Sequence, residues 1–181
     1  MKNTKNALVI LAGGNGSRFG KKLPKQFTQI NGENLIHFFL KRIDTNNFDK
    51  IVIVCKISYF KFFKKLEYDF PSVKFIYTKA GKDRQSSSYN GLKILKSFCP
   101  KNVLIHDAAR PFCSNNLVIK ILKNLKKNFS AIPYIVNSDK KMILKKEFNK
   151  NIKLIQTPQG FKFQNIFEAH KNALIKNARD D

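Results

Sequence analysis

The sequence predicts an α/β protein: a doubly wound, mostly parallel sheet with a protruding β-hairpin arm. Short apolar runs alternate with longer segments whose apolar residues recur at helical spacing. Strands that alternate with helices in this way form parallel sheets with right-handed crossovers. The alternation stops after Ala131, where shorter extended segments and a polar turn follow. This change of pattern predicts the arm.

Four short runs predict strands, and they cover residues 7–12, 50–55, 73–77 and 102–106. The runs at 7–12 and 50–55 have the composition of strands buried on both faces of a parallel sheet. In such sheets ligands bind in the crevice outside the carboxyl ends of the strands. The residues that follow each run are therefore the first candidates for a site.

Helix-like patterns fill the stretches between these runs and continue after the last of them. They cover residues 34–43, 58–70, 86–98, 115–128 and 164–176. Pro71 and Pro100 close two of these helices, because a proline disfavours helical backbone in the residue before it. Residues 156–161 are expected to lead into the last helix.

The arm is expected at residues 132–155, with extended segments at 132–136 and 142–145 and a polar turn at 137–141 between them. The chain has 181 residues, of which 43% are hydrophobic. A chain of this size buries one sizeable core, so we expect a single domain over residues 1–181.

The chain is strongly basic, with 35 Lys and Arg against 12 Asp and Glu and a formal net charge of +23. A surplus of this size attracts polyanions, whether nucleic acid, an anionic membrane or phosphorylated metabolites. A compositional bias explains the lysines equally well, because Lys, Asn, Ile and Phe are abundant along the whole chain. Charge alone does not choose among these partners.

The three cysteines, Cys55, Cys99 and Cys113, form no C-x-x-C pair. They indicate neither a zinc site nor a disulfide framework, so a reducing cytoplasm fits best. The apolar run at residues 7–12 is too short for the core of a signal peptide or for a transmembrane helix. We therefore expect a cytoplasmic protein without membrane contact.

A glycine-rich loop follows the first strand and carries the strongest signal for an anion. Residues 11–20 read LAGGNGSRFG, and Pro-Lys-Gln follows at 24–26. Glycines let backbone N–H groups approach an anion closely, while Arg18 and Lys25 add positive charges within reach of phosphates. The dinucleotide fingerprint would need a glycine at Phe19, and the P-loop would need one at Asn15. The loop therefore belongs to another class of phosphate cradle, or is only a structural turn.

The second candidate segment is His-Asp-Ala-Ala-Arg-Pro-Phe at residues 106–112, at the carboxyl end of the fourth strand. Asp107 is suited to hold a hydroxyl group or a metal ion, and Arg110 is suited to hold a phosphate. The two alanines between them leave room for a ligand. The competing interpretation is a structural Asp–Arg pair at the strand end.

Four motifs in this order resemble the 2-C-methyl-D-erythritol 4-phosphate cytidylyltransferase family of the non-mevalonate isoprenoid pathway. They are the glycine-rich loop, the Pro-Lys-Gln triplet, the Asp107 to Arg110 segment and Gln-Thr-Pro-Gln at residues 156–159. The resemblance runs from the first strand to the last residue. It implies a Rossmann-like, GT-A-like nucleotidyltransferase that uses CTP with Mg²⁺, acts on a small sugar phosphate, forms a homodimer through the arm and binds neither nucleic acid nor membrane.

The resemblance also implies a role for particular residues. Arg18 and Lys25 would be catalytic, acting on the phosphates. Thr157 would contact the incoming phosphate, and Asp139 would bind substrate from the arm. Asp107 and Arg110 would face the ribose and the sugar phosphate. The CTP site would be lined near the triphosphate by Ala12, Gly13, Gly14 and Gly16, and near the cytosine and ribose by Gly81, Arg84 and Ser87.

The chain departs from the family pattern at several positions. The usual Asp-Thr of the arm is Asp139-Lys140, and an arm arginine falls near Asn149. Gly13 stands where the family commonly has alanine, which from sequence is a mild change. The family also continues beyond the position of Asp181 through a strand and a helix, so the sequence is expected to lack these elements or to continue into a fused enzyme.

Two other functions remain open at this point. A cytidylyltransferase for ribitol or ribulose 5-phosphate shares the glycine loop and the Asp-Ala-[Ala/Val]-Arg segment. A basic nucleic-acid-binding protein without catalytic activity would instead gather arginines or aromatic residues on one face. Here the lysines are spread over every expected helix, which favours an enzyme.

Overall fold

A six-stranded sheet forms the centre of the protein in the computed structural model, which describes residues 5–14, 28–137, 142–143, 146–147 and 152–176. The strand order is β5-β4-β1-β6-β12-β7. The bounds of these strands are β1 Asn6–Leu11, β4 Lys50–Cys55, β5 Lys74–Lys79, β6 Asn102–Asp107, β7 Ser130–Ala131 and β12 Gln159–Lys162. The first four are parallel, and β12 is antiparallel to both β6 and β7. The four strands and the mostly parallel sheet expected from sequence are thus confirmed. Strands β1, β4 and β6 are largely buried, whereas β5 lies at the edge of the sheet and buries only Phe75.

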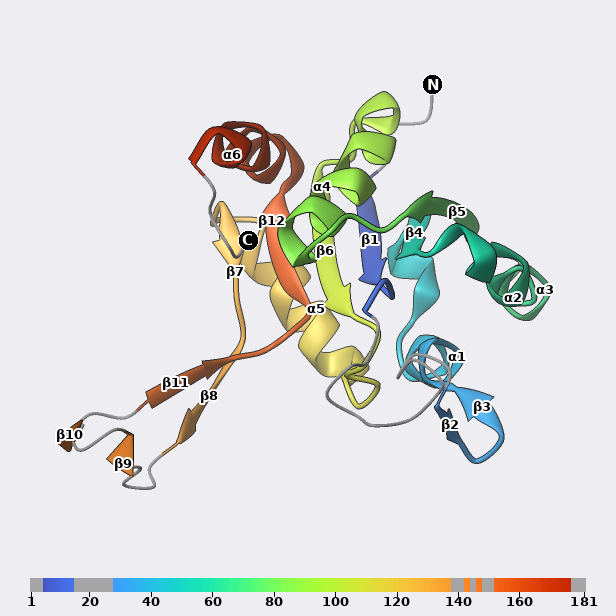
Figure 1. Cartoon of the computed structure of the whole chain (residues 1–181), viewed down its shortest axis with the longest axis horizontal. Coiled ribbons are helices and arrows are strands. Elements are labelled where there is room, and N and C mark those ends of the chain that lie inside the picture. Colours follow the sequence, from blue (N-terminus) through green and yellow to red (C-terminus); the bar gives the residue numbers. More distant parts are fainter. Residues whose placement is uncertain (1–4, 15–27, 138–141, 144–145, 148–151, 177–181) are drawn as a thin grey trace.

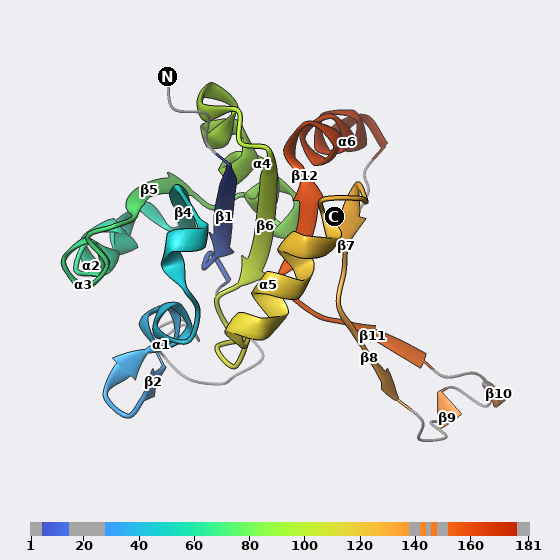
Figure 2. The ribbon, with the colours of Figure 1, turned by 180° about the vertical axis from the view of Figure 1, so that it is seen from behind.

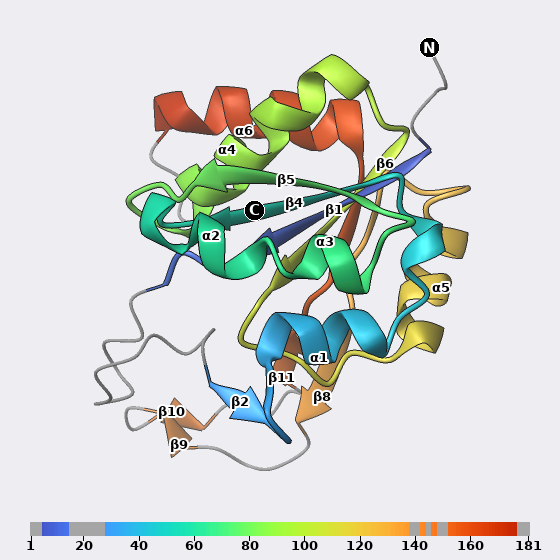
Figure 3. The ribbon, with the colours of Figure 1, turned by 90° about the vertical axis from the view of Figure 1, so that its right-hand side faces the viewer.

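Helices cover both faces of the sheet, as Figure 3 shows. The bounds of the helices and 3₁₀ turns are α1 Leu35–Lys41, η3 Thr45–Asn47, η4 Ile57–Tyr59, α2 Phe60–Phe63, α3 Leu66–Asp69, α4 Arg84–Leu95, η5 Lys96–Phe98, α5 Asn115–Asn124 and α6 Phe163–Lys176. Helices α4 and α6 pack with Val9, Val52 and Val103 in one apolar layer. Helices α1, α3 and α5 lie on the other face, which buries Leu8 and Ile10. Seen from behind in Figure 2, α5 runs across this second face.

The helix expected at residues 58–70 is wrong as a continuous element, because the structure divides it into η4, α2 and α3. The hydroxyl of Tyr77 donates a hydrogen bond to the backbone carbonyl of Phe63 at 3.1 Å, where α2 ends. Phe63 and Leu66 are both buried on the two sides of the break. The apolar spacing that suggests one helix therefore comes from two short helices that face the same core.

Strand β12 was not expected from the sequence, whose residues 156–161 were predicted to lead into the last helix. The strand has four residues and contains Gly160, so it carries little strand signal of its own. A Cβ added at Gly160 would lie 2.3 Å from Cγ2 of Ile121 on α5. The glycine allows α5 to pack directly on this strand, which a single sequence does not reveal.

The arm projects away from the sheet in Figure 1. Its strands β8 Tyr134–Asn137 and β11 Ile152–Ile155 pair antiparallel, while β9 Met142–Ile143 pairs with β10 Lys146–Glu147. The expected pairing of 132–136 with 142–145 is therefore wrong, because 152–155 is the partner of the first strand. A small hairpin of β2 Gln29–Ile30 and β3 Glu33–Asn34 was also not expected. Across the described residues, every helix is too short or too polar to cross a membrane.

Candidate active site

Strands β1 and β6 are neighbours in the sheet, and their carboxyl ends bring the two candidate motifs together. Leu11, the last residue of β1, is in register with Asp107, the last residue of β6. The backbone N–H of Ala108 donates to the carbonyl of Leu11 at 3.0 Å, and Ala12 donates to Val54 at 2.8 Å. The start of the glycine loop is therefore fixed beside Asp107 by backbone hydrogen bonds.

The loop that follows β5 lies against the glycine loop. The backbone N–H of Gly81 donates to Oγ of Ser87 at 3.0 Å. A Cβ added at Gly13 would lie 2.3 Å from Cβ of Ala80 and 3.9 Å from Oγ of Ser87. The structure thus brings together three of the predicted CTP-site residues, Gly13, Gly81 and Ser87. It also shows that alanine at position 13 would not be a mild change in this chain, because the methyl group of Ala80 fills that space.

Asp107 lies between two arginines that come from different elements. Arg84, the first residue of α4, donates from Nε to Oδ1 of Asp107 at 3.3 Å. Nε of Arg110 lies 3.3 Å from Oδ2 of the same carboxylate. The side chains of Arg84 and Asp107 are each 27% exposed and that of Arg110 is 43% exposed, so all three are accessible to a ligand. One carboxylate between two guanidinium groups leaves a net positive charge for an anion.

Two glutamines, for which the sequence predicted no role of their own, complete this group. Arg84 donates to Oε1 of Gln159 at 3.2 Å, and Arg110 donates to Oε1 of Gln156. Both glutamines belong to the Gln-Thr-Pro-Gln motif, and this motif is the sequence feature from which their role could have been predicted. Their amide oxygens neutralise no charge, so they orient the two guanidinium groups and leave the positive charge available.

A buried histidine connects the same two segments. His106 is fully buried and lies 3.1 Å from the hydroxyl of Thr157 through Nδ1 and 3.1 Å from the carbonyl of Arg110 through Nε2. Its ring stacks on Phe39, with 4.1 Å between the ring centroids. Burial lowers the pKa of His106 to about 3, so the imidazole is neutral at physiological pH.

Several predicted residues lie outside the described residues: Gly16, Arg18 and Lys25 of the glycine loop and Asp139 of the arm. Their roles stay predictions. Gly14 is described, and a Cβ added there would meet no atom within 4 Å. Of the residues expected at the site, the structure therefore gathers those that follow β1, β5 and β6 and those that precede β12.

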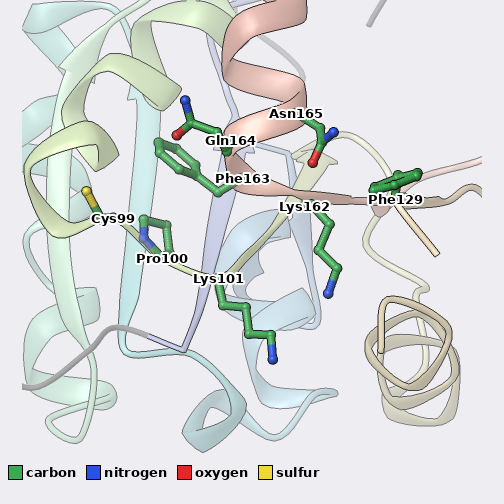
Figure 4. A pocket seen from close by; sticks show the side chains of 8 residues that line it. All are labelled: Cys99, Pro100, Lys101, Phe129, Lys162, Phe163, Gln164 and Asn165. Carbon is green, nitrogen blue, oxygen red and sulfur yellow. The ribbon is translucent and has the colours of Figure 1, made fainter. Parts of the chain in front are cut away.

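A shallow pocket elsewhere, shown in Figure 4, is lined by residues that include Lys101, Phe129 and Lys162. Lys101 precedes β6, whereas Asp107 is its last residue. The pocket is therefore at the opposite end of this strand from the candidate site.

Comparison with known proteins identifies the family. The family model described as 2-C-methyl-D-erythritol 4-phosphate cytidylyltransferase (IspD) matches residues 6–181. The chain belongs to this family. A relative of that name from Thermotoga neapolitana is 34% identical over 173 residues, which cover 91% of this chain and 76% of the relative. The bifunctional enzyme IspD/IspF of Pelagibacter ubique is 40% identical over 176 residues, which cover 92% of this chain and 46% of that protein.

Solved structures of the IspD family have the same fold. The 4-diphosphocytidyl-2C-methyl-D-erythritol synthase of Anaerococcus prevotii superposes with a TM-score of 0.79 at 24% identity, covering 96% of this chain and 76% of the other. The bifunctional IspDF of Campylobacter jejuni gives a TM-score of 0.75 at 27% identity and covers 92% and 43% of the two chains. Membership of the IspD family favours an enzyme over a nucleic-acid-binding protein, and an erythritol phosphate over ribitol or ribulose 5-phosphate.

Proposed function

We propose that this chain transfers CMP from CTP to 2-C-methyl-D-erythritol 4-phosphate and releases pyrophosphate. Family membership supports the reaction, and the arrangement around Asp107 supports the location of the active site. Arg84 and Arg110 flank this carboxylate at the carboxyl end of β6, next to the glycine loop that follows β1. This is the edge of a parallel sheet where ligands bind.

The chemistry requires two anions to meet. A phosphate oxygen of the sugar phosphate attacks the α-phosphorus of CTP, a new P–O bond forms, and the bond to the β-phosphate breaks as pyrophosphate leaves. The attacking phosphate monoester is already ionised at pH 7, so the reaction needs no general base. The task of the protein is therefore to neutralise and align charge. Arg84 and Arg110 supply this charge among the described residues, and Arg18 and Lys25 are the proposed groups on the triphosphate.

Magnesium fits this site as an ion that is bound mainly by the triphosphate. Within the part of the chain that the structure describes, no three His, Cys, Asp or Glu side chains gather as a metal cage. Both oxygens of Asp107 already pair with guanidinium groups, so this carboxylate is not a free metal ligand in the structure. Mg²⁺ would therefore be held mainly by the triphosphate and water. It would supply charge neutralisation on the triphosphate.

The arm is the proposed dimer interface. Ile135, Val136, Leu154 and Ile155 are between 43% and 58% exposed, so the ribbon of β8 and β11 presents apolar side chains to solvent on both of its faces. Exposed apolar surface of this kind marks an interaction site. We propose that a second copy of the chain covers it, and that the protein acts in the cytoplasm, where its free cysteines stay reduced.

The test of the proposed function is pyrophosphate release from CTP with 2-C-methyl-D-erythritol 4-phosphate, ribitol 5-phosphate or ribulose 5-phosphate as the acceptor. We expect release with the first acceptor only. Asp107→Asn preserves the shape of the side chain but removes its charge, and we expect kcat/KM to fall by about 10²-fold. Lys123→Ala on α5 is the control, because this lysine is exposed outside the site. Release with ribitol or ribulose 5-phosphate but not with the erythritol phosphate would refute the proposal.

Lys25 is tested separately because it lies outside the described residues. Lys25→Ala removes a proposed phosphate contact, and we expect single-turnover rates with CTP to fall by about two orders of magnitude while the fold is kept. Circular dichroism checks the fold. A rate near that of the wild type would remove Lys25 from the mechanism.

A further inference from the structure

The buried imidazole of His106 joins the Asp107–Arg110 turn to the segment that precedes β12. It lies one residue before Asp107, and its two ring nitrogens contact groups from different segments. Nε2 is 3.1 Å from the backbone carbonyl of Arg110, in the turn that follows β6. Nδ1 is 3.1 Å from the hydroxyl of Thr157, in the segment before β12. Both ring nitrogens therefore have a hydrogen-bond partner, and one face of the ring stacks on Phe39.

The partners determine which nitrogen carries the proton. A carbonyl oxygen only accepts hydrogen bonds, so Nε2 must be the N–H group. His106 is fully buried, and its ring nitrogens meet a carbonyl and a hydroxyl instead of a carboxylate, so the ring stays neutral and carries one proton only. Nδ1 is then an acceptor, and the hydroxyl of Thr157 must donate to it.

This donation determines what Thr157 can offer to a ligand. The oxygen of Thr157 also accepts the backbone N–H of Asp107 at 3.3 Å. A hydroxyl has one proton and two lone pairs, so Thr157 retains a single lone pair. A phosphate at neutral pH presents acceptor oxygens and cannot donate to that lone pair, whereas a sugar hydroxyl can. A contact of Thr157 with the incoming phosphate, as the resemblance implies, would therefore require the hydroxyl proton to leave His106.

We propose that His106 is a positioning residue for the acceptor substrate: it holds the Asp107–Arg110 turn against Thr157 and turns the Thr157 hydroxyl into an acceptor for a hydroxyl group of the sugar. The proposal rests on the proposed function for the identity of the sugar. The hydrogen-bond arrangement itself does not depend on the reaction, so the two parts are tested separately.

The first experiment reads the tautomer without any activity. Nitrogen-15 NMR of the full chain, labelled at histidine, distinguishes a protonated from an unprotonated ring nitrogen, and His106→Phe assigns the resonances. We expect the Nε2–H form, and we expect Thr157→Val to shift the Nδ1 resonance because its donor is lost. Thr157→Ser keeps the hydroxyl and should leave the resonance in place. A protonated Nδ1, or an Nδ1 resonance insensitive to Thr157→Val, would overturn the proposal even if the enzyme is active.

The second experiment separates acceptor binding from CTP binding. His106→Phe keeps the ring stacked on Phe39 and removes both hydrogen bonds. We expect KM for the sugar phosphate to rise about tenfold, as the loss of a buried hydrogen-bond partner implies, while KM for CTP changes little. Thr157→Val should act in the same way, and the double variant should be no worse than either single one. His37→Phe is the control, because His37 pairs with Glu33 and Asp69 outside the site.

Two inhibitors distinguish a hydroxyl contact from a phosphate contact at Thr157. We expect Thr157→Val to weaken competitive inhibition by 2-C-methyl-D-erythritol and to leave inhibition by inorganic phosphate unchanged. The reverse result would show that Thr157 contacts the phosphate and would overturn the proposal. Equal increases of KM for CTP and for the sugar phosphate in His106→Phe would also overturn it, because they indicate a general structural role. If the wild-type chain releases no pyrophosphate, the proposed function fails and the NMR result still decides the hydrogen bonds.

Discussion

Gly13 and Ala80 share one small space at the edge of the site. Gly13 follows β1 and Ala80 follows β5, and the backbone N–H of Ala80 donates to the carbonyl of Cys55 at 2.9 Å, which fixes the position of its methyl group. A Cβ at position 13 would lie 2.3 Å from that methyl carbon. Two methyl groups cannot occupy this space together, so glycine at one position and alanine at the other form a matched pair.

Gly13→Ala is expected to lower the free energy of unfolding by about 1–3 kcal/mol, the usual cost of overpacking. Ala80→Gly removes the opposing methyl group, so the double variant should be more stable than Gly13→Ala alone. Urea unfolding of the single and double variants measures the coupling. Gly14→Ala is the matched control, because a Cβ there meets no neighbour within 4 Å. Simple additivity of the two changes would contradict the shared space.

His106 makes stability depend on pH in a defined direction. Its pKa is lowered from 6.5 to about 3 in the folded protein. Between these two pH values the histidine is protonated in the unfolded chain but stays neutral in the folded chain. Stability is therefore complete above the unfolded pKa and is lost as the pH falls, with a slope of at most about 1.4 kcal/mol per pH unit.

The measurement is the free energy of unfolding in urea at several values from about pH 7 down to about pH 4, the window given by this linkage. We expect the wild type to lose stability steadily and His106→Phe to show a flatter dependence. The pKa values of Glu33 and Asp83 are also lowered. Their protonation therefore reduces stability at still lower pH, equally in the wild type and in His106→Phe. Parallel curves for the two proteins would contradict a neutral, buried His106.

At the scale of elements, the first turn of α4 supports the nucleotide side of the site. Asp83 is the N-cap: its Oδ1 accepts from the backbone N–H of Ser86 at 2.7 Å, and the hydroxyl of Ser86 accepts from the backbone of Asp83 at 3.1 Å. The next residues in the helix are Arg84, which contacts Asp107, and Ser87, which accepts from Gly81. The cap therefore fixes both side chains.

Asp83→Ala is expected to lower the free energy of unfolding by about 1 kcal/mol, the usual cost of losing an N-cap. Because the first turn also positions Arg84 and Ser87, KM for CTP should rise. Thermal unfolding and pyrophosphate release measure the two effects. Asp83→Ser keeps a capping oxygen and serves as the control. Loss of stability without a change of KM would show that the first turn does not organise the nucleotide site.

At the scale of the whole molecule, the arm has no cover within the described chain. Ile135 of β8 pairs with Leu154 of β11, so both lie on one face of the ribbon. Both are exposed. A two-stranded ribbon is marginally stable by itself in water, which favours a second copy as its support.

Charging this face should dissociate the proposed dimer. We expect the wild type to run as a dimer in size-exclusion chromatography with light scattering, and Ile135→Asp with Leu154→Asp to run as a monomer, because buried unpaired carboxylates are costly. Phe129→Asp is the control, since Phe129 is 74% exposed outside the arm. A monomeric wild type, or a dimer that survives both changes, would contradict the arm interface.

The sequence by itself determined the parallel part of the sheet and predicted the edge at which the candidate site lies. The apolar runs at 7–12 and 50–55 became β1 and β4, because strands buried on both faces need apolar residues at nearly every position. The runs at 73–77 and 102–106 became β5 and β6. The glycine loop and the Asp107 motif follow two of these strands, so their meeting at one edge followed from the chain order. Local signals were sufficient wherever the structure obeys such a rule.

Only the tertiary structure decided which distant segments come together around the candidate site. Strand β12 runs antiparallel beside β6 and carries Gln159 to Arg84, although its four residues have no strand pattern of their own. The low pKa of His106 results from its burial, where its ring stacks on Phe39. Position 13 must be glycine-sized because Ala80, far away in sequence, fills the space where a Cβ would lie. These features depend on contacts between distant segments, and no local preference of the chain encodes which segments will meet.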